Sequence, residues 1–124
     1  RIKLLLPVSY AQAQQLIQAC SMVVLPSRTE AMGRVVLEAW AASKPVIVSN
    51  VDGLPYYVKH EQNGLVFEVG NSSELATCLS RLLREPTLAR ALAENGRHAA
   101  LNDYNETEYT QAFLRLLNEV KSLS

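Results

Sequence analysis

The chain has 124 residues, of which 48% are hydrophobic, so it can form one domain with a sizeable core and is not expected to be disordered. Twelve basic and twelve acidic residues leave no net charge that would favour nucleic acid or an anionic membrane as a partner. No apolar run approaches the roughly 20 residues of a membrane-spanning helix, and no segment resembles a signal peptide, so we expect a cytoplasmic protein.

Apolar runs alternate with helical patterns in the first part of the chain. Residues 2–6 form a short apolar run that predicts a strand, and apolar residues at helical spacing follow Ser9. A second apolar run, 22–25, ends at Pro26, and the segment 33–42 is apolar almost all round, as in a helix buried on most sides. Because a strand is predicted from the first residues onward, we expect the chain to be a piece of a longer protein.

Two more apolar runs, 45–48 and 65–67, are too short for helices and show no alternation, which indicates strands covered on both faces. Strands that alternate with helices at this spacing predict parallel pairing through right-handed crossovers. The sequence therefore predicts a single α/β domain over 1–124. Its architecture is a Rossmann-like half-domain with a short parallel sheet of about four strands, flanking helices and a C-terminal helical tail.

The segment 71–124 is predicted to be the helical tail of this domain. Asn71, with Glu74 three residues on, has the pattern of a capping box that begins a first helix. A second helix begins at Pro86 and is predicted to end at Gly96, because glycine is typical just past a helix C-terminus. A last amphipathic helix follows.

Ligands of open parallel sheets bind at the carboxyl ends of the strands, so the loops 26–33, 49–55 and 69–72 are the candidate sites. The first loop places the carboxylate of Glu30 directly before a helix that begins near Gly33. The free N–H groups and partial positive charge of such a helix end suit a phosphate. Gly33 would let the backbone approach an anion closely, and a glycine required simply for a tight turn is the equal alternative.

Glu38 is a carboxylate in an otherwise apolar helix, and burying an unpaired charge is unfavourable. It lies about 7.5 Å along the helix axis from Gly33, and its side chain tilts back toward the amino end. That distance suits a sugar hydroxyl beside a phosphate bound at the helix tip. The alternative is a core glutamate satisfied by a backbone group or by an arginine.

These residues belong to a longer series of short motifs. The series consists of PS at 26–27, EAMGRVVLEA at 30–39, AASKPVI at 41–47, DGLP at 52–55 and NGLVF at 63–67. In this order it resembles the signature of the family 4 retaining glycosyltransferases, which carry a Glu-x7-Glu motif at the place of Glu30 and Glu38. The resemblance covers nearly the whole chain.

The resemblance implies a role for each residue of the motif. Family members have two Rossmann-like domains that face each other across a cleft, the GT-B arrangement, and the C-terminal domain holds most of the nucleotide sugar. Glu30 would be the catalytic candidate and would hold hydroxyls of the donor hexose, whereas Glu38 would bind the nucleotide ribose. The backbone N–H groups of Met32 and Gly33 would face the sugar and the diphosphate, where fixed N–H groups stabilise the leaving charge.

The implied reaction transfers a hexosyl group from a nucleotide-sugar donor to a glycan or glycolipid acceptor with retention of configuration. It needs no bound metal and no other cofactor. The basic pair that clamps the diphosphate and the N-terminal domain with its catalytic histidine are absent from this sequence, so we expect the isolated chain to be inactive. Peripheral contact with the inner face of the membrane stays open for a full-length enzyme.

Three residues depart from the family pattern. Met32 stands where Phe or a similar residue is usual, which is a tolerable apolar exchange. Ser43 stands where Gly is usual, and we expect the turn before Lys44 to avoid a positive φ. Tyr56 stands where Glu commonly follows the GLP turn, so the rim of the donor site and its sugar preference are expected to differ.

Other chemistry-bearing residues are given structural interpretations. Cys20 and Cys78 show no C-x-x-C spacing, so we expect reduced thiols and no metal site. His60 and His98 have no triad partner and are interpreted as solvated imidazoles. Trp40 is interpreted as a core residue.

Two alternatives from other classes remain open. The same domain could be a non-catalytic module that binds a nucleotide sugar. It could also be a structural or regulatory domain that pairs with a partner through an exposed first strand at 2–6.

Overall fold

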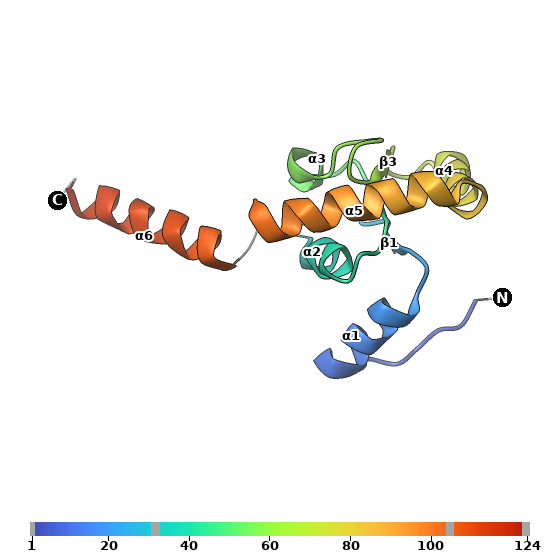
Figure 1. Cartoon of the computed structure of the whole chain (residues 1–124), viewed down its shortest axis with the longest axis horizontal. Coiled ribbons are helices and arrows are strands. Elements are labelled where there is room, and N and C mark those ends of the chain that lie inside the picture. The colour runs from blue at the N-terminus through green and yellow to red at the C-terminus, as the bar shows by residue number, and fades with distance from the viewer. Residues whose placement is uncertain (1, 31–32, 104–105, 123–124) are drawn as a thin grey trace.

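The computed structural model describes the backbone of residues 2–30, 33–103 and 106–122 and, within the last helix, the side chains of 111, 114, 115 and 117–122. The elements follow one another in this order: α1 (Tyr10–Ala19), β1 (Val23–Leu25), α2 (Arg34–Ala41), β2 (Val46–Ser49), α3 (Leu54–Tyr57), β3 (Leu65–Phe67), α4 (Ser72–Arg84), α5 (Pro86–Asn102) and α6 (Glu106–Ser122). Figure 1 shows a layered body made by β1 to α5, with α1 beneath it and α6 leading away from it.

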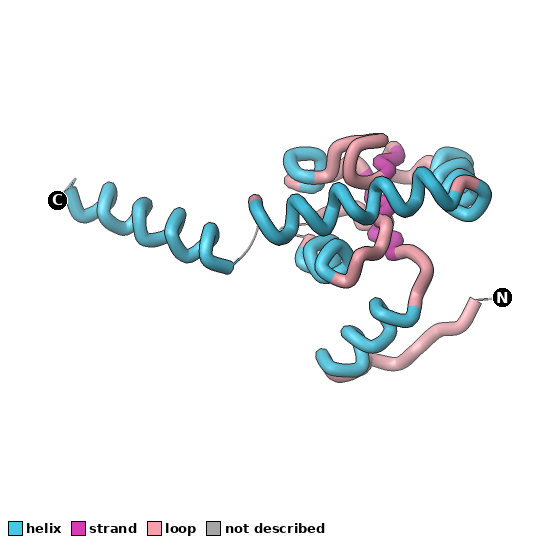
Figure 2. Tube along the Cα trace, viewed as in Figure 1, coloured by secondary structure: helices cyan, strands magenta, loops and turns pink. Residues whose placement is uncertain are grey.

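The strands form a parallel sheet in the order β1-β2-β3. Val24 of β1 lies opposite Ile47 of β2, and Val48 of β2 lies opposite Val66 of β3. All four residues of the central strand β2 are buried, and Figure 2 shows the strands enclosed by helices. The α/β prediction is therefore confirmed, because apolar runs without alternation need cover on both faces of the sheet.

Alternate side chains of β2 enter two separate cores on the two faces of the sheet. Val46 and Val48 pack with Trp40 of α2 in one core. Ile47 packs with Leu82 of α4 in the other. Since α2 and α4 lie on opposite faces, the sheet is the middle layer of three, and α5 contributes residues to both cores.

The strand predicted at 2–6 is wrong. Residues 2–9 have no regular structure, and Ile2, Leu4 and Leu6 are 86–91% exposed. The sheet therefore has three strands, not about four, in the part of the chain that the structure describes. An apolar run becomes a strand only where a neighbour satisfies its backbone groups, and residues 2–9 lie as an extended loop away from the sheet (Figure 2).

The predicted helical tail contains α4, α5 and α6. Asn71 caps α4 as expected, because its side-chain oxygen accepts the Glu74 N–H at 2.9 Å. The helix end predicted at Gly96 is wrong, since α5 continues to Asn102. A Cβ added at Gly96 would lie 2.2 Å from Trp40 Cδ1, so the glycine is required by the close approach of α5 to α2.

The turn that leads from α2 into β2 also corrects an expectation. Ser43 has a φ of 59°, so the turn before Lys44 does adopt a positive φ. The Lys44 N–H donates to the Ala39 carbonyl and the Ser43 N–H donates to the Trp40 carbonyl, both at 2.9 Å. These two bonds form a Schellman motif, whose left-handed position favours glycine. Ser43 therefore occupies it with some strain.

Candidate functional site

The loop after β1 is fastened to the end of β2 by a buried hydroxyl. Ser49, the last residue of β2, is fully buried, and its hydroxyl donates to the Ser27 carbonyl at 2.6 Å. The bond fixes the loop that leads to Glu30, because a buried carbonyl is unfavourable without a partner. The first two candidate loops therefore meet at the carboxyl ends of the strands.

Glu30 is half-buried and takes part in three hydrogen bonds, with Ser27 of its own loop, with Gly33 before α2 and with Asp52 of the second loop. Its carboxylate accepts the Gly33 N–H at 3.1 Å and the Ser27 hydroxyl at 3.2 Å. Its own backbone N–H donates to Asp52 Oδ2 at 2.6 Å. The carboxylate thus accepts a hydrogen bond from one of the otherwise free N–H groups at the amino end of α2, where an anion is favoured.

Asp52 is a site residue that the sequence patterns did not single out. It lies in the second candidate loop and adopts a φ of 47°, a conformation that aspartate tolerates better than most residues. Its place in the DGLP motif was the one available signal. The contact with Glu30 could not be read from the sequence, because it joins two loops 22 residues apart.

These residues line an open hollow. Thr29, Glu30, Asp52 and Gly53 surround about 490 Å³ at the carboxyl ends of β1 and β2. This volume lies in the range typical of small-molecule sites. Its two carboxylates accept hydrogen bonds and offer none, so they complement a ligand rich in hydroxyl groups.

Gly33 is required by backbone conformation and by packing. It is buried, with φ 60° and ψ 44°, directly before α2. A Cβ added there would lie 2.2 Å from the Tyr57 hydroxyl and 2.7 Å from Leu54 Cδ2. The tight-turn explanation is therefore supported, and Gly33 still presents the N–H that Glu30 now takes up.

Glu38 is half-buried on α2, less enclosed than an all-apolar helix suggested. Within the described ranges, neither a backbone group nor an arginine forms a hydrogen bond or ion pair with its carboxylate, so the alternative of a satisfied core glutamate finds no support. Met32 lies outside the described residues. The structure thus brings Glu30 and Gly33 together, and Glu38 lies more than one helical turn farther along α2.

The third candidate loop is tied to the second. The Asn50 side chain accepts the Val69 N–H at 2.9 Å, and the Asn50 N–H donates to the Phe67 carbonyl at 2.9 Å. All three loops at this end of the sheet are thus linked by hydrogen bonds of polar residues at the end of β2 and in the loop after it.

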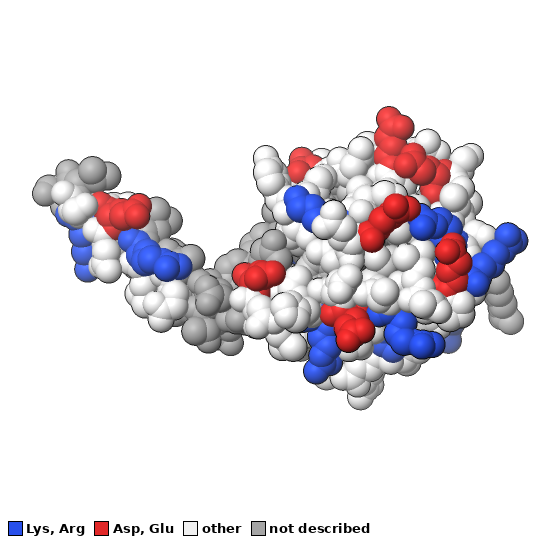
Figure 3. All heavy atoms as spheres, turned by 45° about the horizontal axis from the view of Figure 1, so that its top comes forward, with Lys and Arg blue, Asp and Glu red and all other residues white. Residues whose placement is uncertain are grey.

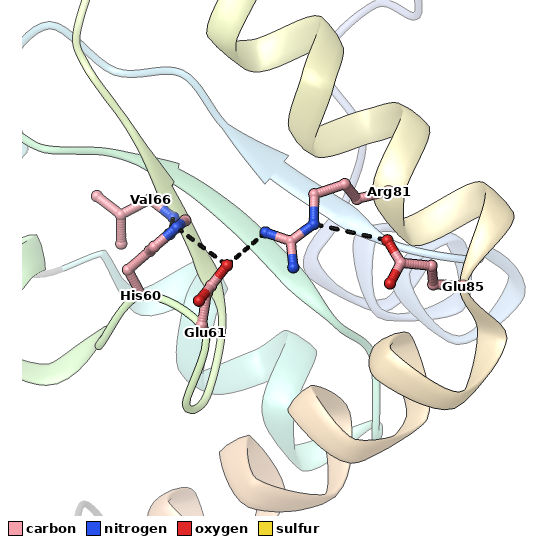
Figure 4. Close-up of polar contacts among 5 residues, drawn as sticks. All are labelled: His60, Glu61, Val66, Arg81 and Glu85. Atoms are coloured by element: carbon pink, nitrogen blue, oxygen red, sulfur yellow. Dashed lines mark hydrogen bonds and ion pairs between the residues drawn. The ribbon is translucent and has the colours of Figure 1, made fainter.

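A second polar cluster lies between β3 and α4 (Figure 4). His60 is exposed, as expected, but its Nδ1 also accepts the Val66 N–H at 2.9 Å and so covers the outer edge of β3. Glu61 accepts from Arg81 at 2.7 Å, and Arg81 lies 3.6 Å from Glu85. The Arg81 guanidinium lowers the pKa of the Glu61 carboxyl. Because every member has a partner, we interpret the cluster as structural.

Three further observations bear on ligand class. No helix in the described part of the chain is long and apolar enough to cross a membrane. Among the same residues, no three His, Cys, Asp or Glu side chains gather as a metal site would require. On the face shown in Figure 3, acidic and basic side chains are interspersed over the body and along the C-terminal arm.

The chain is similar to several known proteins. Residues 1–99 match the family described as glycosyl transferases group 1. A lipopolysaccharide core biosynthesis glycosyltransferase, LpsE of Rhizobium meliloti, is 28% identical over 99 residues, which are 80% of this chain and 29% of LpsE.

Two solved structures have the same fold. Sucrose-phosphate synthase of Thermosynechococcus elongatus has a TM-score of 0.80 and 32% identity, over 88% of this chain and 27% of that one. HepE of Anabaena, solved in complex with UDP-glucose, has a TM-score of 0.80 and 28% identity, over 85% of this chain and 29% of that one. The chain thus spans less than a third of the length of these relatives. Since the family match covers most of its residues, the chain belongs to the group 1 glycosyl transferases.

Proposed function

We propose that this chain is the donor-binding part of a family 4 glycosyltransferase with the two-domain GT-B arrangement. The enzyme would transfer a hexosyl group from a nucleotide sugar to a glycan or glycolipid acceptor and retain the anomeric configuration. The observation that carries the proposal is the hollow of about 490 Å³ in which Glu30 and Asp52 lie beside the amino end of α2.

The hexose would bind in this hollow, with its hydroxyls donating to the Glu30 carboxylate. The diphosphate would lie against the amino end of α2, where the backbone N–H groups of Met32 and Gly33 would stabilise the charge that develops as the sugar departs. Glu30 now accepts the Gly33 N–H. Donor binding therefore requires the carboxylate to exchange that N–H for sugar hydroxyls.

Glu38 would bind the ribose of the nucleotide. Its carboxylate is half-buried and, in the described ranges, unpaired, so a ligand hydroxyl would meet a group that is only partly solvated. It follows Gly33 on the same helix, so a ribose next to a diphosphate at the helix tip lies within reach.

The names of the relatives support the choice of partners. HepE was solved with UDP-glucose, which supports a nucleotide sugar as donor, and LpsE is named for lipopolysaccharide core biosynthesis, which supports a glycan or glycolipid acceptor. The backbone N–H groups at the amino end of α2 would stabilise the negative charge on the leaving diphosphate. We therefore propose a reaction without a metal cofactor. The acceptor would bind to an N-terminal domain outside this sequence.

Ligand-observed NMR of this chain against UDP-, GDP- and ADP-glucose tests donor binding. We expect saturation transfer with one nucleotide class, lost or strongly reduced in Glu38→Ala. The matched control is Glu94→Ala, which removes an exposed glutamate on α5 outside the site. Equal binding by wild type and Glu38→Ala would refute the ribose assignment, and silence of wild type across the panel would refute donor binding by this chain.

Product analysis separates transfer from binding alone. A longer form of the protein that includes the acceptor domain should release the nucleoside diphosphate and give an α-linked product from an α-linked donor. A β-linked product would refute retention. Binding without any release would favour the non-catalytic nucleotide-sugar-binding module.

A further inference from the structure

Two hydrogen bonds of 2.6 Å join the described residues of the two loops that line the hollow: one links Ser49 to Ser27, and the other links Asp52 to the Glu30 backbone. Asp52 Oδ2 accepts the Glu30 N–H at 2.6 Å. A bond to a charged acceptor is stronger than one between neutral groups. It fixes the backbone of the residue whose side chain would hold the sugar.

The backbone of Asp52 indicates that this side chain is there for the contact. Its φ of 47° lies in the left-handed region, where glycine would be free of strain. Gly53, the next residue, has an ordinary φ of −81°, so the left-handed position falls on the residue with the carboxylate. Strained residues persist where surrounding interactions hold them, and the bond to Glu30 is such an interaction.

The side chain of Glu30 is fixed by a different set of groups. Ser27 and Gly33 donate to its carboxylate, at 3.2 and 3.1 Å, and both belong to the first loop and the start of α2. These two bonds compete directly with ligand hydroxyls for the carboxylate oxygens. The Asp52 bond does not compete, because it is made to the backbone, so it can persist while the carboxylate changes partners.

We propose that Asp52 is a positioning residue of the donor site. It holds the backbone of Glu30 so that the carboxylate, released from Gly33, points at the hexose in the hollow. The inference rests on the proposed function, in which Glu30 binds hexose hydroxyls. Asp52 itself does not contact the nucleotide in this arrangement.

Two substitutions separate the acceptor from the backbone conformation. Asp52→Gly removes the acceptor and relieves the left-handed strain, which offsets part of the lost hydrogen bond, so the variant should still fold. Asp52→Asn keeps an acceptor oxygen and tolerates the same φ. We expect the Glu30 amide proton in a ¹H–¹⁵N spectrum to shift upfield in Asp52→Gly and much less in Asp52→Asn.

Binding is then measured by NMR titration with UDP and with UDP-glucose. For wild type, UDP-glucose should bind more tightly than UDP, because only the former offers a hexose to Glu30. In Asp52→Gly the affinity for UDP-glucose should fall about tenfold, whereas the affinity for UDP should stay within about twofold. Asp52→Asn should recover most of the loss.

The outcomes distinguish this inference from the proposed function. An affinity for UDP-glucose that is the same in Asp52→Gly as in wild type would overturn the role of Asp52 and leave donor binding intact. An equal loss of UDP and UDP-glucose would overturn it as well, because it would mean a general disturbance of the loop. Failure of wild type to bind either ligand would overturn donor binding for these two ligands, and the role of Asp52 with it.

Discussion

The carboxyl half of α2 is fixed by close apolar packing, whereas its amino end is also held by a hydrogen bond to Glu30, whose backbone is bonded to Asp52 of the second loop. Trp40 is fully buried, lies against Gly96 of α5 and donates its indole N–H to the Asn63 carbonyl at 3.1 Å. At the other end, Glu30 takes up the Gly33 N–H beside an open hollow. Close apolar packing around Trp40 leaves no groups that a ligand could bind. The hydrogen bonds at the amino end, in contrast, can be replaced by hydrogen bonds to a ligand.

This difference between the two ends of α2 explains how one helix can combine stability with ligand binding. At the packed end Trp40 is fully buried against Gly96 of α5, so this end holds the position of the helix. The hydrogen-bonded end keeps polar groups satisfied in the absence of ligand, and each of its bonds contributes only about 1 kcal/mol net. A ligand that supplies equivalent partners would therefore displace them at little net cost.

The largest expected effect is at the packed end. Gly96→Ala would place a methyl group within 2.2 Å of Trp40, so α5 and α2 must separate. We expect a loss of about 3 kcal/mol in the free energy of unfolding, measured by urea denaturation. Gly70→Ala is the control, because an added Cβ meets nothing there and only its φ of 80° opposes it. An equal loss in both variants would show that packing on Trp40 is not the cause.

An intermediate effect is expected at the hydrogen-bonded end. Ser49→Ala removes the buried hydroxyl that donates to the Ser27 carbonyl. The free energy of unfolding should fall by about 1–2 kcal/mol, because that carbonyl loses its partner. Urea denaturation measures the loss, and hydrogen exchange should increase in the loop 27–30. Ser21→Ala, at an exposed serine, should change neither. Unchanged exchange in Ser49→Ala would mean that the Ser49 bond does not hold the loop.

The smallest expected effect lies just past the packed end of α2. Ser43→Gly relieves a left-handed residue with a φ of 59° and gives up a contact with the exposed Arg97 side chain at 3.1 Å. The net result should be a stabilisation of about 0.5–1 kcal/mol, seen as a higher melting temperature. A lower melting temperature would mean that the Arg97 contact outweighs the strain.

The sequence by itself determined β1, β2 and β3, the helices α1, α2 and α4 to α6, and the position of Glu30 and Gly33 at the start of α2. The apolar runs at β1, β2 and β3, and the helical spacing between them, are local patterns, and in these segments the tertiary structure follows them. Glu30 and Gly33 stand directly before α2, so their position at a helix end beside the carboxyl ends of strands followed from the fold class. The motif series indicated a glycosyltransferase, and the match to the group 1 glycosyl transferases supports that assignment.

Only the tertiary structure decided which residues meet. Residues 2–6 have the pattern of a strand but no strand beside them, and Gly96 has the pattern of a helix end but lies against Trp40 in the middle of α5. Asp52 reaches Glu30 across 22 residues of sequence. In each case the physical reason is the same: the deciding partner is distant along the chain, and a local pattern specifies a residue's own backbone preference but not its neighbour in space.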